Sequence, residues 1–81
     1  MEPKDYGIDP HEEIVDNSVG ALRVRIGFNP DNNEEVAEIK ALTAALINIC
    51  ESLKPKDGRL AALAQTAYEE AAMWAVKAAT A

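Results

Sequence analysis

Residues 34–81 read EEVAEIKALTAALINICESLKPKDGRLAALAQTAYEEAAMWAVKAATA, and this stretch determines the fold. It holds two long apolar segments, separated by a short one that contains Pro55 and Gly58. Proline and glycine interrupt helices, and Asn32 or Asn33 offers an N-cap before the first segment. Two helices of about 20 residues joined by so short a turn form an antiparallel hairpin. The stretch therefore predicts an all-α helical hairpin over residues 34–81.

Both segments repeat apolar residues at alternating intervals of three and four, which is the spacing of a packed helix seam. In the first segment the seam residues are Val36, Ile39, Thr43, Leu46, Cys50 and Leu53. In the second they are Leu60, Leu63, Ala64, Ala67, Ala71, Trp74 and Ala78. Leu42, Ile47 and Ile49 widen the first seam beyond one side, so that helix needs more than one partner.

Residues 1–33 are predicted to form an N-terminal arm with a short helix. Asp9 and Pro10 have the residue types of an N-cap and a first helical position, and this helix is expected to end between residues 17 and 20. Residues 22–26 alternate apolar and basic side chains, a period of two that favours an extended segment. Residues 27–33 have the composition of a loop.

The chain has 81 residues, which is enough for one domain. It contains fifteen alanines and only four aromatic residues, so its helices bring little apolar area per residue. A chain of this size also buries a small share of its surface when it folds alone. Small size and small side chains together predict a homo-oligomer.

The net charge is −6, from 8 basic and 14 acidic residues. Residues 1–40 carry all of this excess, and residues 41–81 are balanced. Such an acidic chain is a poor candidate for binding DNA or an anionic membrane. The start, MEPKDYGIDPHEE, has no apolar core of a signal peptide, and the single Cys50 fits a reducing compartment. These features predict a cytoplasmic protein.

Few residues are suited to catalysis or metal binding. His11 is expected to be exposed in the first turn of the arm helix, and Cys50 is expected to be buried in the seam as an inert thiol. The neighbours Glu69 and Glu70 point about 100° apart on a helix, so they do not form a ready pair of carboxylates. We therefore expect a protein that is not an enzyme and holds neither a metal nor a cofactor.

A second group of residues has the chemistry of an anion site. Arg23 and Arg25 would point the same way from an extended segment, as a phosphate clamp requires, and Phe28 offers a face for a base. Asn29 lies in the adjacent loop, and Lys40 is nearly two turns into the following helix. In the alternative interpretation the two arginines pair with carboxylates and Phe28 packs the arm onto the hairpin.

Three stretches resemble a known family: RLAALAQTAYEEAAMWAVKA at residues 59–78, RIGFNP at 25–30, and IKALT at 39–43. The most specific is EEAAMWAVKA at residues 69–78. The chain resembles, over about residues 22–81, a phage family of helical hairpins that act as anti-CBASS cyclic-oligonucleotide sponges. A related hairpin domain occurs in anti-Thoeris sponges.

The resemblance implies a homo-oligomer, typically a hexamer, that binds cyclic dinucleotides between protomers without cleaving them, with cyclic trinucleotides as further candidate ligands. Such sequestration blocks host CBASS signalling in the cytosol of an infected bacterium. By position, Lys40, Thr43 and Arg59 match family residues that contact the ligand, and either Phe28 or Tyr6 matches the aromatic that stacks on a base. The alternative function is a small acidic helical adaptor that binds another protein and has no nucleotide ligand.

Overall fold

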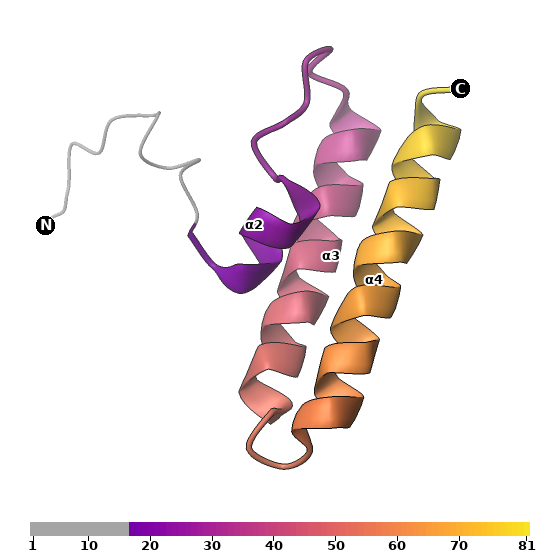
Figure 1. The fold of residues 1–81 in the computed structure, drawn as a ribbon. Helices are drawn as coiled ribbons and strands as arrows, with labels where there is room; N and C mark the ends of the chain where they lie inside the picture. Colours follow the sequence, from indigo (N-terminus) through magenta and orange to yellow (C-terminus); the bar gives the residue numbers. More distant parts are fainter. Residues whose placement is uncertain (1–16) are drawn as a thin grey trace, which may run out of the picture.

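The computed structural model describes residues 17–81, which are helical throughout with short connections and no strand. The elements are α2 (Val19–Val24), α3 (Glu34–Leu53) and α4 (Gly58–Ala79). Helices α3 and α4 lie side by side as an antiparallel hairpin, and α2 packs across α3 (Figure 1). The all-α fold and the two long helices were predicted from the sequence. Tyr6, His11 and the predicted arm helix at Asp9 and Pro10 lie outside the described residues.

The long helices begin and end where the sequence indicated. Asn33 caps α3, because its side-chain oxygen accepts a hydrogen bond from the Val36 amide at 3.0 Å. Asp57 caps α4 in the same way, through the Leu60 amide at 2.9 Å. The connection at residues 54–57 is here called the turn end of the hairpin. The opposite end, formed by residues 25–33 and the first turns of α3, is called the loop end (Figure 1).

The predicted extended segment at residues 22–26 is wrong, because residues 19–24 form helix α2. Ser18 caps this helix by accepting a hydrogen bond from the Ala21 amide at 3.1 Å. The buried residues Gly20, Ala21 and Val24 have helical spacing, whereas Leu22 is exposed. Burial of this face against α3 therefore outweighs the local alternation of apolar and basic side chains.

Gly20 lets α2 approach α3 very closely. A Cβ atom at this position would lie 2.0 Å from the backbone oxygen of Ala44, a distance that no side chain tolerates. The Gly20 amide donates a hydrogen bond to the Asn48 side chain at 2.7 Å, which fixes the same contact. Helix α2 is thus held by backbone-to-helix packing as well as by apolar side chains.

The core is small and contains two polar side chains. Ile47 is fully buried and Val24, Ala44 and Ala72 pack in the same cluster. Buried α3 positions are Val36, Lys40, Ala44, Ile47 and Cys50, so Val36 and Cys50 of the predicted seam are buried while Leu46 and Leu53 are exposed. Buried α4 positions are Ala61, Gln65 and Ala72, whereas Leu60, Leu63 and Trp74 of that predicted seam are exposed.

Gln65 connects the three helices. Its side chain is 1% exposed, and its amide nitrogen donates to the Ile47 carbonyl at 3.1 Å and to the Glu51 carboxylate at 2.9 Å. Its oxygen accepts a hydrogen bond from Arg23 of α2 at 3.3 Å. The bond from Gln65 and the neighbouring Lys54 lower the pKa of Glu51. The hydrogen-bonding groups of this buried amide are therefore satisfied by all three helices.

Within residues 17–81, no helix combines the length and apolar character that a membrane span requires.

Candidate functional site

The loop end contains a cavity of about 290 Å³ between α2, α3 and α4. Three cations, one carboxylate and one aromatic ring contribute to its wall, together with apolar side chains. The lining residues are Arg23, Val24, Arg25, Phe28, Lys40, Glu69, Ala72, Met73 and Val76. The structure therefore brings together four of the site residues predicted from the sequence: Arg23, Arg25, Phe28 and Lys40.

Arg25 owes its position to the way α2 ends. It adopts the left-handed conformation at φ 55° and ψ 58°, and the Ile26 amide bonds back to the Ala21 carbonyl at 3.0 Å. This is the usual C-terminal helix motif, in which glycine is the favoured residue. A side chain in this conformation costs about 1 kcal/mol. The arginine is therefore present despite a backbone preference for glycine.

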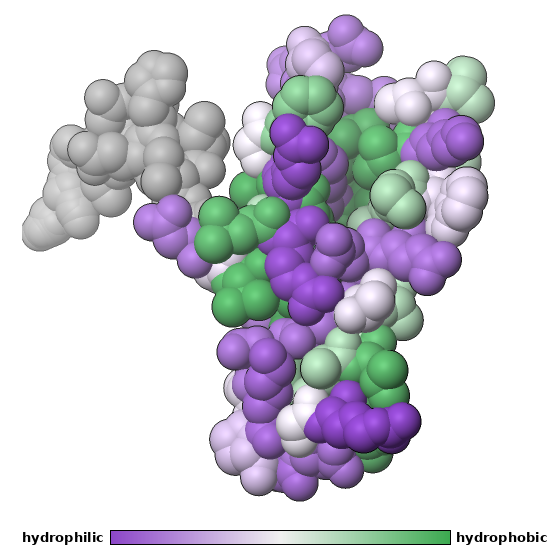
Figure 2. Space-filling view, in the orientation of Figure 1, coloured by the Kyte–Doolittle hydropathy of each residue, from purple (hydrophilic) through white to green (hydrophobic). Residues whose placement is uncertain are grey.

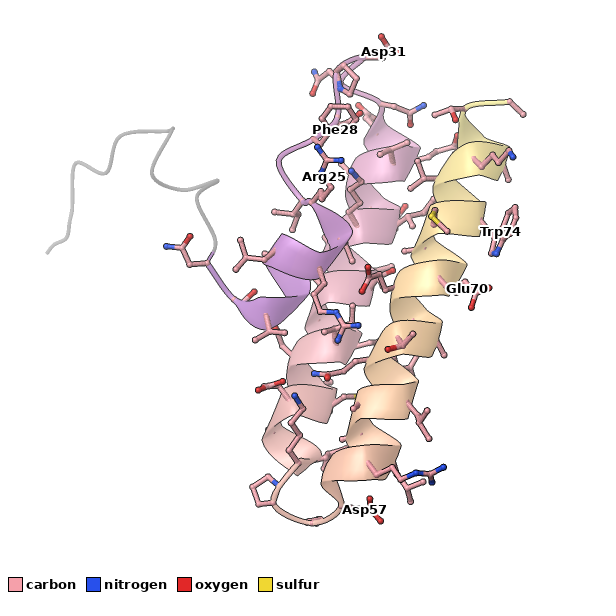
Figure 3. The ribbon with its side chains drawn as sticks, viewed as in Figure 1. Arg25, Phe28, Asp31, Asp57, Glu70 and Trp74 are labelled. Atoms are coloured by element: carbon pink, nitrogen blue, oxygen red, sulfur yellow. The ribbon has the colours of Figure 1, made fainter. Side chains whose placement is uncertain are left out.

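Arg25 and Lys40 converge on Phe28. The Arg25 guanidinium carbon lies 4.7 Å from the ring centroid, and the Lys40 ammonium nitrogen lies 5.4 Å from it. Figure 3 shows Arg25 and Phe28 next to each other beside the upper part of α3. The ring is 56% exposed, so more than half of its surface is open to a ligand. Both cations lie within the range of a cation–π interaction.

Lys40 is the most unusual residue of the site. Its side chain is 7% exposed, and its ammonium group donates to the Arg25 carbonyl at 3.0 Å and to the Phe28 carbonyl. An ammonium group has three N–H donors, and neither acceptor carries a formal charge. No carboxylate in the described part of the chain forms an ion pair with it. Burial and then the nearby Arg25 lower the pKa of Lys40.

Arg23 lines the cavity, but its guanidinium group is hydrogen-bonded to side chains of α4. Its Nε donates to the Glu69 carboxylate at 2.8 Å, and its two terminal nitrogens reach Gln65 and Thr66 at 3.3 Å each. The extended segment from which Arg23 and Arg25 were expected to point the same way is absent, although both arginines line the cavity. The two residues lie on a helix and at its left-handed end, and Arg23 pairs with a carboxylate as the alternative interpretation expected.

Asn29 organises the loop. Its side chain donates to the Asn33 carbonyl at 2.8 Å and accepts from the Asn33 amide at 3.0 Å, so it ties the loop to the start of α3. It also lines a second cavity of about 210 Å³, which shares Phe28, Lys40 and Val76 with the first. The two cavities flank the same aromatic ring and the same ammonium group.

Thr43 and Arg59 do not line either cavity. The Thr43 hydroxyl donates to the Ile39 carbonyl at 2.6 Å, within its own helix. Arg59 is exposed in the first turn of α4, at the turn end. Leu53 lies thirteen positions after Lys40 on α3, which is about 20 Å of helix. Within the chain, Lys40 and Arg59 therefore belong to separate regions.

The sequence interpretation did not place residues of α4 in the cavity wall. Glu69, Ala72, Met73 and Val76 contribute to it, at relative positions 0, 3, 4 and 7 of one helix face. This spacing is the sequence signal that could have identified the four residues as one helix face. Residues 17–81 hold no group of three or more His, Cys, Asp or Glu side chains arranged to bind a metal ion.

Comparison with protein families matches residues 20–80 to the family described as the Acb2/Tad1 hairpin domain. The match covers α2, the loop end and both long helices. The chain belongs to the Acb2/Tad1 hairpin-domain family. This confirms the resemblance found in the sequence, and the family is one of sponge-type hairpin domains. No curated protein and no solved structure matches the chain in the same comparison.

Proposed function

We propose that this protein binds cyclic oligonucleotide second messengers at the loop end and sequesters them without chemical change. The observation that carries the proposal is the convergence of Arg25 and Lys40 on the exposed Phe28 ring beside a cavity. Phosphate requires cations, and a nucleobase requires an aromatic face. Membership in a sponge-type family supports the same assignment.

The size of the cavity supports a ligand shared between protomers. About 290 Å³ is at the lower limit of pockets that enclose a drug-sized ligand. A cyclic dinucleotide has two bases and two phosphates, so two such cavities facing each other across a two-fold axis match its symmetry. The proposal is therefore a homo-oligomer, with a hexamer as the expected state, in which each protomer contributes one half-site.

Exposed apolar side chains supply surface for this assembly. On α3 they are Leu42, Leu46, Ile49 and Leu53, and on α4 they are Leu60, Leu63, Met73 and Trp74. Figure 2 shows apolar surface over α2 and over the lower part of α4. Figure 3 shows Trp74 on the side of α4 that faces away from α3. We expect these exposed side chains of the predicted seams to make the contacts between protomers.

A separate ligand contact is proposed for Arg59. It is remote from Lys40 within one protomer, and the family resemblance assigns it a ligand role. We expect it to contact a second class of ligand, the cyclic trinucleotides, where turn ends of several protomers meet. Thr43 is expected to contact a ligand only through the assembly, because it lines neither cavity of the single chain. The site of action is the cytosol of an infected bacterial cell.

A thermal-shift assay with a panel of cyclic di- and trinucleotides tests the proposal. A ligand present at a hundred times its dissociation constant stabilises the native state by about 2.7 kcal/mol. Ligand recovered after heat denaturation should be intact, and linear products would instead show a phosphodiesterase. If no member of the panel shifts the melting temperature, the exposed apolar surface favours the alternative function, an adaptor for another protein.

The variant Arg25→Gly separates binding from folding. Glycine relieves the left-handed backbone conformation and removes the guanidinium, so the melting temperature should stay the same or rise while ligand affinity falls by about tenfold or more. Calorimetric titration and thermal denaturation of the same preparation measure both effects. Unchanged affinity would contradict the assignment of Arg25 to the site.

A further inference from the structure

Among the described residues, one acidic group lines the cavity at the loop end, and its position is fixed by an ion pair. Glu69 lines the cavity from α4, and its carboxylate is held at 2.8 Å by Arg23 Nε. Arg23 is itself fixed by the Gln65 side chain, which is 1% exposed, and by the Thr66 hydroxyl. A buried amide thus orients an arginine, and the arginine orients the carboxylate. Such indirect support gives a binding group a defined geometry before any ligand arrives.

The Glu69 carboxylate keeps most of its capacity to accept hydrogen bonds. An ionised carboxylate accepts about four, and in the described structure Arg23 is the one donor bonded to this one. Its side chain is 46% exposed, so the remaining lone pairs are accessible to a ligand. The ion pair with Arg23 also offsets the charge that would otherwise repel an anion.

The charges in the cavity favour one orientation of a bound nucleotide. Phosphate is attracted to Arg25 and Lys40, which have no carboxylate partner among residues 17–81, whereas the Arg23–Glu69 ion pair offers it no net positive charge. The base therefore extends toward Glu69, along a wall formed by Ala72, Met73 and Val76. An acceptor at this place meets the hydrogen-bonding edge of the base rather than its phosphate.

We propose that Glu69 is a specificity-determining residue that selects guanine, by accepting hydrogen bonds from the N1–H and the 2-amino group of the base. Guanine presents these two donors side by side on its pairing edge. Adenine presents its 6-amino donor beside the N1 lone pair, which a carboxylate repels. Charge-assisted bonds with two parallel donors are stronger and more selective than single neutral ones. This inference rests on the proposed function, because it names the base that the same site prefers.

The experiment measures the affinities of cyclic di-GMP and cyclic di-AMP for the whole protein by calorimetric titration. The unmodified protein should bind cyclic di-GMP about tenfold or more tightly than cyclic di-AMP. Glu69→Gln should lose this preference and gain affinity for cyclic di-AMP, because an amide offers one donor and one acceptor to adenine. It should still fold, since the amide oxygen can accept from Arg23.

Glu70→Gln is the matched control, because it removes the same charge from the adjacent residue. Glu70 lies on the side of α4 away from α3 (Figure 3), and it lines neither cavity. It should leave the preference for guanine unchanged. Loss of the preference in both variants would show a general effect of charge and would overturn the assignment.

The preference for guanine can also be tested in the unmodified protein by changing the base of the ligand. Cyclic di-inosine monophosphate lacks the 2-amino group, so the unmodified protein should bind it more weakly than cyclic di-GMP. Equal binding of guanine, inosine and adenine ligands would overturn the selection by Glu69 and leave the proposed function intact. Failure of all cyclic dinucleotides to bind would overturn the proposed function and this inference with it.

Discussion

At the loop end, Arg25 and Lys40 lie 4.7 and 5.4 Å from the centre of the Phe28 ring, and Lys40 is buried. At the turn end, Lys54, Lys56 and Arg59 are exposed, and Lys54 forms a short-range ion pair with Glu51 at 3.0 Å. Both ends carry similar numbers of cations. The loop end, however, buries one of them, against uncharged carbonyl groups and an aromatic ring.

This difference shows what a binding site requires within one protomer. An exposed lysine or arginine is solvated, and its attraction for an anion is weakened by water and salt. A partly desolvated cation with remaining donors interacts more strongly with an anion that reaches it. The proposed half-site at the loop end is therefore present in the single chain, whereas the ligand role proposed for Arg59 depends on other copies of the chain.

The largest effect is expected for Gly20→Ala, which disturbs the loop end through the packing of α2. The added Cβ would lie 2.0 Å from the Ala44 backbone oxygen, so α2 must move away from α3. Overpacking of this kind costs about 1–3 kcal/mol, and we expect the upper part of that range together with loss of ligand binding. Chemical denaturation and titration measure the two effects. Gly27→Ala is the control, because its Cβ would have no neighbour within 4 Å and its φ is not positive.

The second prediction compares Lys40→Ala with Arg59→Ala directly. Each should leave the oligomer intact and weaken binding by about 1.5–3 kcal/mol, the contribution of a hydrogen bond to a charged group. Lys40→Ala should affect cyclic dinucleotides and Arg59→Ala cyclic trinucleotides, since Lys40 lies toward the loop end of α3 and Arg59 lies in the first turn of α4, near the turn end. Calorimetric titration of both variants with both ligand classes distinguishes them. Unchanged affinity for all ligands would show that these cations serve only the surface or the assembly.

Lys40→Ala also removes two hydrogen bonds from the loop, so its stability without ligand must be measured in parallel. The carbonyl groups of Arg25 and Phe28 would lose their buried donor, which destabilises the loop end. Arg59 makes no such contact and its substitution should leave the unliganded stability unchanged. A lower stability for Lys40→Ala with full ligand affinity would identify Lys40 as a loop-positioning residue only.

The third prediction compares the two helix caps. Asn33→Ala and Asp57→Ala each remove one side-chain acceptor from a helix start and should each cost about 1 kcal/mol of stability. Asn33 lies in the loop that carries Phe28, and its backbone is tied to Asn29, so its substitution should also weaken dinucleotide binding. Asp57 lies at the turn end, and its substitution should leave that binding unchanged. Equal losses of affinity in the two variants would indicate that affinity follows global stability alone.

The sequence predicts the hairpin because its signals are local. Asn33 and Asp57 are cap residues, Pro55 interrupts the first helix, and the apolar periodicity identifies both long helices. Helix α2 was missed because its signal is not local. Gly20 is favourable there only because Ala44 of another helix lies against it, and residues 22–26 on their own alternate like a strand.

Only part of the candidate site was predicted, because the rest of it depends on contacts between helices rather than on local sequence signals. Lys40 was expected to lie with its stem against the protein, and its burial confirms this. The roles of Arg23 and Glu69 depend on the pairing of α2 with α4, which no spacing within either helix contains. The assignment of Thr43 and Arg59 to ligand contacts stays a prediction, because it depends on how copies of the chain assemble.

The smallest expected effect is the pH dependence of the loop end. Burial and the nearby Arg25 lower the pKa of Lys40, so its unfolded form binds a proton more readily than its folded form. Unliganded stability should therefore rise as the pH increases through the lowered pKa, because the folded protein no longer holds a disfavoured charge.

Ligand binding should change in the opposite direction, since a phosphate attracts the protonated ammonium group. Affinity for cyclic dinucleotides should be full below the pKa of Lys40 and should fall as the pH rises through it. An exposed lysine would show this loss only at higher pH, so Lys40→Arg should keep its affinity over the range where the unmodified protein weakens. Titration of both proteins across the alkaline range measures the difference, and identical profiles would contradict a ligand contact through the Lys40 ammonium group.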